Sequence, residues 1–235
     1  MKTLLIARRF CGPPGSANGG YFAGMVAALA PQPVTVRLLR PPALDTPFAV
    51  EEQADGSLRV LDGTQVVGEA HPAALALQPA RRPGYLEAVE ASRGYAGFRH
   101  HPFPGCFVCG PHRVRGDGLR IFAGPIAELG IVAAPWVPDV SLDRGDGKVQ
   151  PQFMSAALDC PGYYAVAAQQ TMLLAEFTAH LDRLVHVGEP CTVIGWRIAS
   201  RGRKHEAGTA LFDGKGELCA RARALWIEPR EAVSP

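Results

Sequence analysis

The sequence lacks the features of a membrane, exported or nucleic-acid-binding protein. No apolar stretch approaches the roughly 20 residues that a helix needs to cross a bilayer. The first apolar run, Leu4 to Ala7, is too short for the core of a signal peptide and is followed by Arg8 and Arg9. The net charge is only +2, from 24 basic and 22 acidic residues, which gives no strong field towards nucleic acid or membrane. We therefore expect a cytoplasmic protein with neither kind of partner.

A disulfide framework is also missing. The chain has six cysteines, and only Cys106 and Cys109 stand close together. Without an export signal, this scatter favours free thiols. Hydrophobic residues make up 47% and charged residues 20%, the composition of an ordinary globular domain. The 26 glycines and 21 prolines favour turns and short strands over long helices.

Two parts of the chain show the same order of elements. Each part begins with a small-residue, apolar helix, over residues 19–30 and residues 153–170. Asn18 is a suitable N-cap for the first helix and Pro31 a stop signal. After each helix the sequence predicts two strands and a hairpin, over 34–40, 44–50 and 57–70 in the first part, and 173–181, 187–200 and 208–227 in the second.

Short local matches support this repeat. The hairpin turns are predicted at Asp62-Gly63 and Asp213-Gly214, and Asp-Gly is a strong hairpin signal. One helix on one small sheet leaves sheet edges open, and two such units pairing edge to edge would cover them. We expect a first repeat over residues 1–79, a surface linker over 80–104 with one or two helical turns, a second repeat over 105–229, and a tail over 230–235.

Three stretches resemble the hotdog-fold thioesterase superfamily, in particular its double-hotdog acyl-CoA thioesterases. They are NGGYFAGMVAAL (18–29), CFVCGPHRVRGDGLRIF (106–122) and ALDCPGYYA (157–165). The first is similar to the glycine-led start of a hotdog helix. The second is similar to the C-x-x-C-G turn and Gly-Leu step into a first strand that open many single-hotdog thioesterases.

The resemblance implies an α+β protein with a double hotdog. Its two repeats, each a central helix wrapped by an antiparallel β-sheet, would form a pseudo-dimer. It also implies hydrolysis of acyl-CoA or another acyl thioester without a cofactor. Hotdog sheets commonly assemble further, so a homo-oligomer is among the expectations.

Asp159 is the first catalytic candidate. It lies among small and apolar residues of the second helix, where burial would raise its pKa and suit it to act as a general base towards water. Pro161 removes one helical N–H and can kink the helix. The alternative is that Asp159 only caps a new helical turn that begins at Pro161.

Asn18, Gly19, Gly20 and Tyr21 are candidates for oxyanion stabilisation and substrate positioning. The first N–H groups of a helix are unpaired and lie at its positive end, and glycine permits close approach of a substrate. Tyr21 stands where some relatives in the family have Gln. The alternative is an ordinary N-cap, with glycines that serve helix packing.

Thr178 is the second catalytic candidate. It alternates with Glu176 and His180 on one face of the predicted strand 173–181, and the family often places its water with a polar residue there. The alternative is a solvated strand face. A further Gln of the family, near the last strand, is absent from the region of Ala222 to Ala224. This favours a second hypothesis, a non-hydrolytic acyl-thioester binding or accessory protein.

A third hypothesis is a hotdog dehydratase. That activity usually uses a His–Asp or His–Glu pair on a hotdog helix, and neither predicted helix contains a histidine. For the phosphates of coenzyme A, Arg201, Arg203 and Lys204 in the stretch 200–208 are candidates, as a basic loop. The alternative for this run of charge is an exposed hairpin rim.

The C-x-x-C pair could indicate zinc or redox chemistry. A zinc site needs four nitrogen or sulfur ligands; Cys106 and Cys109 supply two, and His100, His101 and His112 stand at no familiar spacing. A thioredoxin-like pair needs a helix after its first cysteine, but Gly110 and Pro111 follow here. We therefore expect this stretch to be a turn and first strand around Gly118 and Leu119, without metal.

Overall fold

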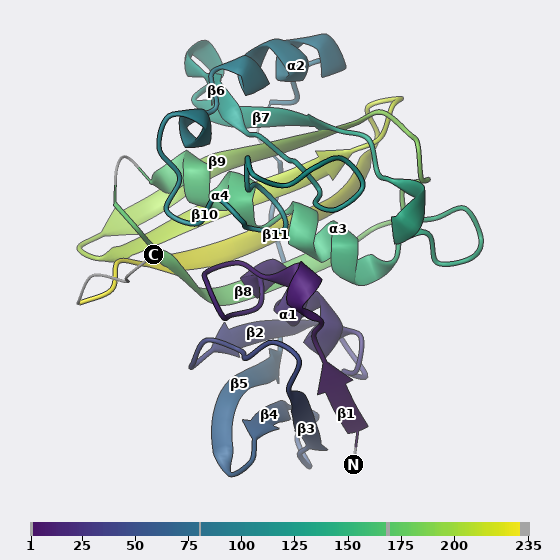
Figure 1. Cartoon of the computed structure of the whole chain (residues 1–235), viewed down its shortest axis with the longest axis vertical. Helices are drawn as coiled ribbons and strands as arrows, with labels where there is room; N and C mark the ends of the chain where they lie inside the picture. Colours follow the sequence, from purple (N-terminus) through teal and green to yellow (C-terminus); the bar gives the residue numbers. More distant parts are fainter. Residues whose placement is uncertain (1, 80, 168–169, 231–235) are drawn as a thin grey trace.

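The computed structural model describes residues 2–79, 81–167 and 170–230. Within this part of the chain, eleven strands form one continuous antiparallel sheet (Figure 1). The strands are β1 (Lys2–Leu5), β2 (Val34–Leu38), β3 (Pro47–Glu52), β4 (Leu58–Asp62), β5 (Gln65–Pro72), β6 (Gly124–Ile126), β7 (Ile131–Trp136), β8 (Leu173–Leu181), β9 (Cys191–Arg201), β10 (Lys204–Phe212) and β11 (Leu218–Ile227).

The sheet has a corresponding strand order on both sides of its centre, with one additional strand, β6 (Gly124–Ile126), at one edge. At the centre β2 pairs with β8, and Val36 lies opposite Phe177. Outward from this pair the order is β2-β5-β4-β3-β1 on one side and β8-β11-β10-β9-β7-β6 on the other. Each side therefore places the first strand after its helices at the centre, and the last hairpin strand beside it.

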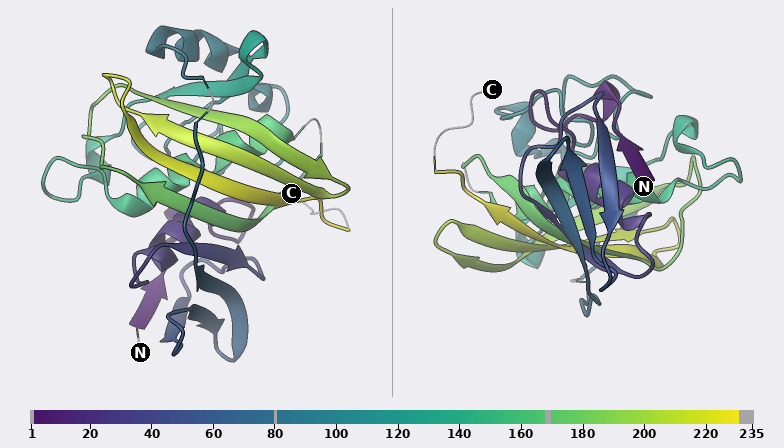
Figure 2. Two further views of the ribbon diagram at one scale, coloured as in Figure 1. Left: turned by 180° about the vertical axis from the view of Figure 1, so that it is seen from behind. Right: turned by 90° about the horizontal axis from the view of Figure 1, so that it is seen from below.

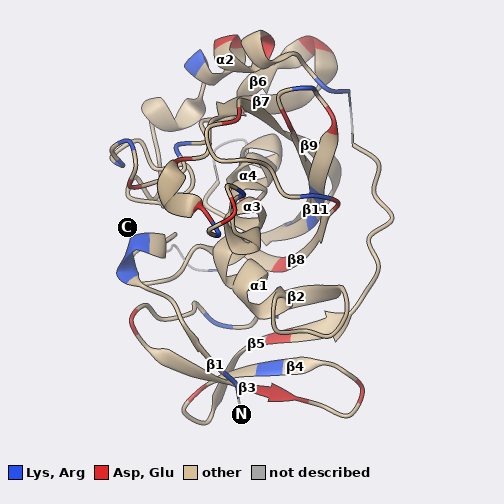
Figure 3. Cartoon of the chain, turned by 90° about the vertical axis from the view of Figure 1, so that its right-hand side faces the viewer, with Lys and Arg blue, Asp and Glu red and all other residues tan. Residues whose placement is uncertain are grey.

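Three helices lie on one face of the sheet: α1 (Gly19–Ala27), α3 (Pro151–Ala157) and α4 (Cys160–Val166). They carry no Lys, Arg, Asp or Glu (Figure 3). Helices α1 and α3 contact each other, and a Cβ atom on Gly24 would lie 2.7 Å from Ser155 Cβ. Glycine at this position therefore lets the two helices approach closely.

The opposite face is covered near one edge by α2 (Tyr85–Arg93), which packs on β6 and β7 through Ala88 and Ala91. Along β9, Ile194 faces this layer whereas Val193 faces the core under α4, as the two-residue period of a strand requires. The described residues between β5 and α2 cross this outer face of the sheet (Figure 2). Short 3₁₀ turns are η1 (Arg8–Phe10), η2 (Ala96–Phe98), η3 (Ala127–Leu129) and η4 (Val140–Leu142).

The strands predicted after each helix are confirmed. The expected strand 173–181 coincides with β8, and both predicted hairpins form, as β4–β5 and β10–β11. Gly63 has the positive φ, +57°, that the first hairpin turn needs. No helix among the described residues is long and apolar enough to cross a membrane.

The prediction of one helix over 153–170 is wrong within the described residues. Helix α3 ends at Ala157 and α4 begins at Cys160, with Leu158 and Asp159 between them. Pro161 has no N–H for the carbonyl of Ala157, so a continuous helix would lose a hydrogen bond here. Residues 168 and 169 lie outside the described residues.

Other expected boundaries also move. Most of 200–208 is strand, because β9 and β10 turn tightly at Gly202 and Arg203, where Gly202 has φ +55°. The prediction of a first strand around Gly118 and Leu119 is wrong. The N–H groups of Leu119 and Ile121 donate to the turn that contains Phe107, and the strand β6 begins only at Gly124. The expected linker contains the nine-residue helix α2. Of the expected tail, only Arg230 is described.

Candidate active site

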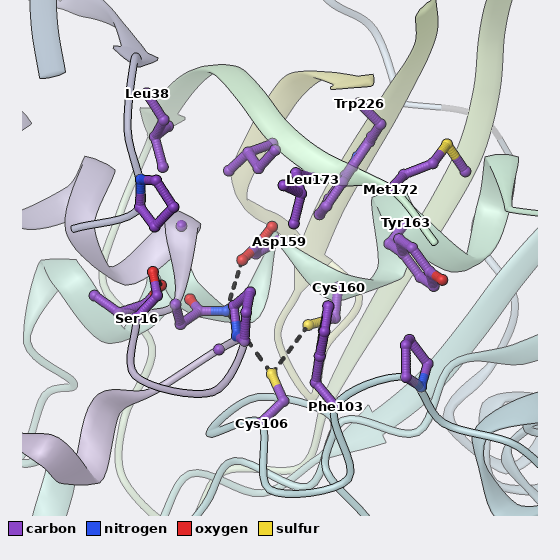
Figure 4. Close-up of a pocket in the computed structure, with 18 of the residues that line it drawn as sticks. Ser16, Leu38, Phe103, Cys106, Asp159, Cys160, Tyr163, Met172, Leu173 and Trp226 are labelled. Atoms are coloured by element: carbon purple, nitrogen blue, oxygen red, sulfur yellow. Dashed lines mark hydrogen bonds between the residues drawn. The ribbon is translucent and has the colours of Figure 1, made fainter. Parts of the chain in front are cut away.

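Asp159 lies at the break between α3 and α4, with only 2% of its surface exposed. One carboxylate oxygen, Oδ2, accepts a hydrogen bond from Asn18 Nδ2 at 2.7 Å (Figure 4). It also accepts one from the backbone N–H of Gly20 at 3.0 Å. Asn18 Oδ1 in turn accepts from the N–H of Tyr21 at 2.9 Å and caps α1. The carboxylate of the second part of the chain is thus held by the start of the helix of the first part.

The other carboxylate oxygen, Oδ1, is buried and has no hydrogen-bond partner within the described part of the chain. A buried acceptor of this kind is usually satisfied by an ordered water. Burial raises the pKa of Asp159 to about 7, although the hydrogen bonds from Gly20 and Asn18 lower it. A carboxyl group with a pKa near neutrality can take a proton from water.

Gly20 is needed for this contact. A Cβ atom at residue 20 would lie 2.6 Å from Asp159 Cβ, closer than two carbon atoms can approach. The N–H of Gly20 is occupied by Asp159, so it is not free to bind an oxyanion as the sequence suggested. The N–H of Gly19, the first residue of α1, makes no hydrogen bond to any described residue.

A cavity of about 340 Å³ opens beside Asp159 (Figure 4). Asn18, Gly19 and Asp159 line it, so three of the predicted site residues share one wall. Most of the remaining lining is apolar: Pro13, Pro14, Leu38, Leu39, Phe103, Tyr163, Met172, Leu173, Leu174, Trp226 and Ile227. A pocket that is mostly apolar with a few convergent polar groups is typical of a small-molecule site.

Tyr21 is not part of the cavity lining. Its ring stacks on Phe10, with 4.3 Å between the ring centroids, and contacts Phe107 and Phe153. Burial raises the pKa of its phenol to about 12. Only its backbone N–H, which is bonded to Asn18, takes part in the arrangement around Asp159.

Thr178 is also away from the cavity. Its hydroxyl lies 2.7 Å from that of Thr35, across the central β2–β8 pair. The neighbouring Glu176 is in an ion pair with Arg37. The structure therefore does not bring Thr178 to the carboxylate of Asp159. Thr178 instead contacts Thr35 at the pair of strands that joins the two parts of the sheet.

The three basic candidates lie at the β9–β10 turn. Arg203 Nη1 donates to the carbonyl of Glu228 at 2.7 Å, next to Pro229 in the cavity lining. Arg201, Arg203 and Lys204 do not themselves line the cavity. Sequence reasoning missed Arg40, which is the only lysine or arginine among the described lining residues.

The C-x-x-C pair lies against the same cavity, together with a third cysteine that the sequence did not connect to it. The sulfur atoms of Cys106, Cys109 and Cys160 all lie within 4.8 Å of one another. Hydrogen bonds from the thiols of Cys109 and Cys160 lower the pKa of Cys106 well below its ordinary value, whereas burial raises the pKa of Cys109 and of Cys160. The link between residues 109 and 160 is long-range, so no spacing in the sequence could reveal it.

Solved structures with this arrangement of strands and helices cover nearly the whole chain. A tesB protein of Mycobacterium avium subspecies paratuberculosis is 14% identical and aligns over 97% of this chain and 92% of its own, with a TM-score of 0.61. A proposed thioesterase from Novosphingobium aromaticivorans is 12% identical over 97% and 94%, with a TM-score of 0.62. A conserved protein of unknown function with a hot dog fold, from Alicyclobacillus acidocaldarius, is 12% identical over 98% and 93%, with a TM-score of 0.56.

The chain therefore has the hotdog fold, of the α+β class, as its sequence resemblance implied. Of these three similar structures, the one from Novosphingobium aromaticivorans carries the name of a thioesterase. At these identities the likeness extends to the fold, and the chemistry has to be argued from the site of this chain. No protein-family model matches the sequence, and no curated protein matches it.

Proposed function

We propose that this protein hydrolyses an acyl thioester of the acyl-CoA type. The observation that carries the proposal is the carboxylate of Asp159. One oxygen is fixed by two donors and the other is buried without a partner, beside an apolar cavity. An apolar cavity suits an acyl chain, and the unpartnered Oδ1 suits a bound water.

The reaction needs one water and two groups of the protein, the carboxylate of Asp159 and the N–H of Gly19. Asp159 Oδ1 would accept a proton from the water while the water oxygen attacks the thioester carbonyl carbon. The N–H of Gly19 would stabilise the negative charge that develops on the carbonyl oxygen. The C–S bond then breaks, the thiolate leaves, and the proton on Asp159 is returned to it. The products are a carboxylic acid and a free thiol.

The site supports a double hotdog with its two repeats as a pseudo-dimer. Apart from the additional edge strand β6, the strand order corresponds on both sides of the β2–β8 pair, and α1 contacts α3 closely at Gly24. Residues 1–79 and 105–229 are the proposed repeats. Gly19 comes from one and Asp159 from the other, so a single repeat would hold an incomplete site.

The polar end of the substrate is proposed to lie at Arg40 and the β9–β10 turn. Arg40 lines the cavity, and Arg203 is bonded to the segment that continues into the lining at Pro229. Arg201 and Lys204 flank that turn. Positive charge at the rim of the cavity would attract the phosphates of coenzyme A.

The direct test is release of free thiol from acyl-CoAs of short, medium and long chain, compared between the wild type and Asp159→Asn. The proposal expects turnover with at least one chain length in the wild type and its loss in the variant. Equal thiol release by both proteins would disprove the role of Asp159.

A second candidate function is acyl-thioester binding without hydrolysis. Two observations favour it: Thr178 is bonded to Thr35 away from the cavity, and the last strand carries Ala222 and Ala224 where the family has a Gln. The two functions are separated by calorimetry combined with the thiol assay. Tight binding of every acyl-CoA with no thiol release would establish the second function instead of the first.

A further inference from the structure

Three cysteine thiols meet at one point between the C-x-x-C turn and the start of α4. The sulfur atoms of Cys106 and Cys160 lie 3.8 Å apart (Figure 4), and Cys109 Sγ lies within 4.8 Å of both. All three cysteines are buried and free. Cys160 lies 54 residues from Cys106 in the chain, so the fold itself brings it to the C-x-x-C pair.

This spacing fits a tetrahedral metal ion. Zinc bonds to thiolate sulfur at about 2.3 Å, so two sulfur ligands of a tetrahedron lie about 3.8 Å apart. The Cys106–Cys160 distance has this value. A disulfide would use two of the three thiols and leave the third without a role, whereas a soft divalent ion uses all three.

We propose that Cys106, Cys109 and Cys160 bind a zinc ion. The sequence alone argued against a metal, because it offered two cysteines and no histidine at a familiar spacing. In the folded chain Cys160, the first residue of α4, supplies a third ligand that the spacing of the sequence did not show. The proposal does not depend on the proposed hydrolysis, since it rests on the thiols alone.

His101 is assigned to the hydrogen-bonding shell of the ion. Its Nε2 lies 3.3 Å from Cys109 Sγ, while its Nδ1 accepts a hydrogen bond from the N–H of Phe103 at 2.9 Å. A neutral imidazole that accepts at Nδ1 carries its proton on Nε2, so it donates to the sulfur. Asn18 Nδ2 lies 4.0 Å from Cys106 Sγ and is a second donor. Such donors orient ligands and tune affinity.

The fourth position is then left for a ligand from outside the chain. The three cysteines and His101 all line the cavity beside Asp159, so the open position is assigned to water or to the thiol of a substrate. Three protein ligands plus one exchangeable ligand is the arrangement of zinc ions that contact substrates. The ion would also join the 106–110 turn to the residue that follows Asp159.

The test is metal content under reducing conditions. Wild-type protein reconstituted with zinc and freed of excess ion should hold one zinc per chain, and the Cys106→Ser, Cys109→Ser and Cys160→Ser variants should each hold none. Cys219→Ser is the matched control, because its thiol bonds to the carbonyl of Glu217 far from the cluster and a hydroxyl can replace that bond. It should bind zinc like the wild type.

Two measurements on folded protein remove the ambiguity of a destabilised variant. In the wild type, cobalt substitution should give a thiolate-to-metal charge-transfer band of three-thiolate intensity, and zinc should raise the Tm. His101→Gln should keep the ion with about 10- to 100-fold lower affinity. A metal-free wild type after reconstitution, or zinc retained in Cys160→Ser, would overturn the proposal. So would zinc bound equally by all variants, or a Cys106–Cys160 disulfide that forms with no metal uptake.

Discussion

The backbone N–H of Gly20 donates a 3.0 Å hydrogen bond to Oδ2 of Asp159, 139 residues later in the chain. One N–H group at the start of α1 is therefore bonded to this carboxylate and is not free to bind a substrate. This bond, with that of Asn18, fixes which oxygen of Asp159 is satisfied and which is available. It leaves the neighbouring N–H of Gly19 as the proposed oxyanion donor.

Asp159→Asn should abolish thioester hydrolysis and preserve the fold. The asparagine oxygen can still accept from Gly20 and Asn18, and a neutral side chain is less costly to bury than a carboxylate. Loss of a general base lowers kcat by about 10²- to 10⁴-fold. Thiol release from acyl-CoA and the Tm are the two measurements, with a Tm no lower than that of the wild type expected.

Asp182→Asn is the control for removing a carboxylate. Asp182 pairs with Arg221 at the surface and does not line the cavity, so its loss should leave kcat unchanged. If Asp159→Asn retained wild-type kcat, the water-activating group would have to be sought elsewhere in the cavity.

Gly20→Ala should lower activity more than Gly24→Ala does. Both new methyl groups meet α3 or the residues after it, at 2.6 Å from Asp159 Cβ and 2.7 Å from Ser155 Cβ respectively. Overpacking costs about 1–3 kcal/mol in each case, against a gain of about 1 kcal/mol in helix propensity. Only residue 20 contacts Asp159. The two variants should therefore differ in kcat, whereas their free energies of unfolding, measured with urea, should be similar. An equal loss of kcat in both would contradict the special role of the Gly20 contact.

Gly19→Pro tests the proposed oxyanion donor by removing one N–H. Proline is favoured at the first position of a helix, and Asn18 already has the extended conformation, φ −61° and ψ 131°, that a following proline requires. Gly19→Ala is the matched control, because it adds the same Cβ contact with Leu174 and keeps the N–H. The proline variant should have kcat about 10²- to 10³-fold below the alanine variant. Similar kcat values would show that Gly19 N–H does not contact the reacting carbonyl.

The succession of strands along the chain was predictable because hairpin turns and apolar alternation are local signals. The dipeptide Asp62-Gly63 predicts its hairpin turn without reference to the rest of the chain. The run 173–181 likewise predicts a strand, and β8 has these bounds. Asp159 could be singled out for a similar reason, as a carboxylate in an apolar helix. Pro161 indicated a kink in the second helix. The exact place of the break, at Leu158 and Asp159, depends on packing.

Contacts between distant parts of the chain were not predictable. The role of Gly20 depends on where Asp159 comes to lie, and the role of Thr178 was misjudged because its partner Thr35 is in the other part of the sheet. Cys160 joins Cys106 through the fold alone. Arg40 had no motif around it, and only its place in the cavity wall draws attention to it.

Arg40→Gln should weaken binding of acyl-CoA and leave unchanged the binding of thioesters that lack the phosphates of coenzyme A. An exposed charge pair contributes up to about 1 kcal/mol, so KM for acyl-CoA should rise about two- to fivefold, and the difference should shrink in high salt. An acyl-N-acetylcysteamine substrate lacks phosphates, so its KM should not change. Lys204→Ala tests the β9–β10 turn in the same assay.

Arg59→Gln, on β4 and outside the cavity lining, is the control for these charge changes and should leave both KM values as they are. A rise confined to acyl-CoA in Arg40→Gln alone would place the phosphates at the cavity wall, whereas a rise in Lys204→Ala alone would place them at the turn. If neither variant raised KM, or if KM rose equally for both substrates, the polar end of the substrate would have to leave the cavity by another route. The comparison of two substrates is decisive because only one of them carries the charge that these residues are proposed to bind.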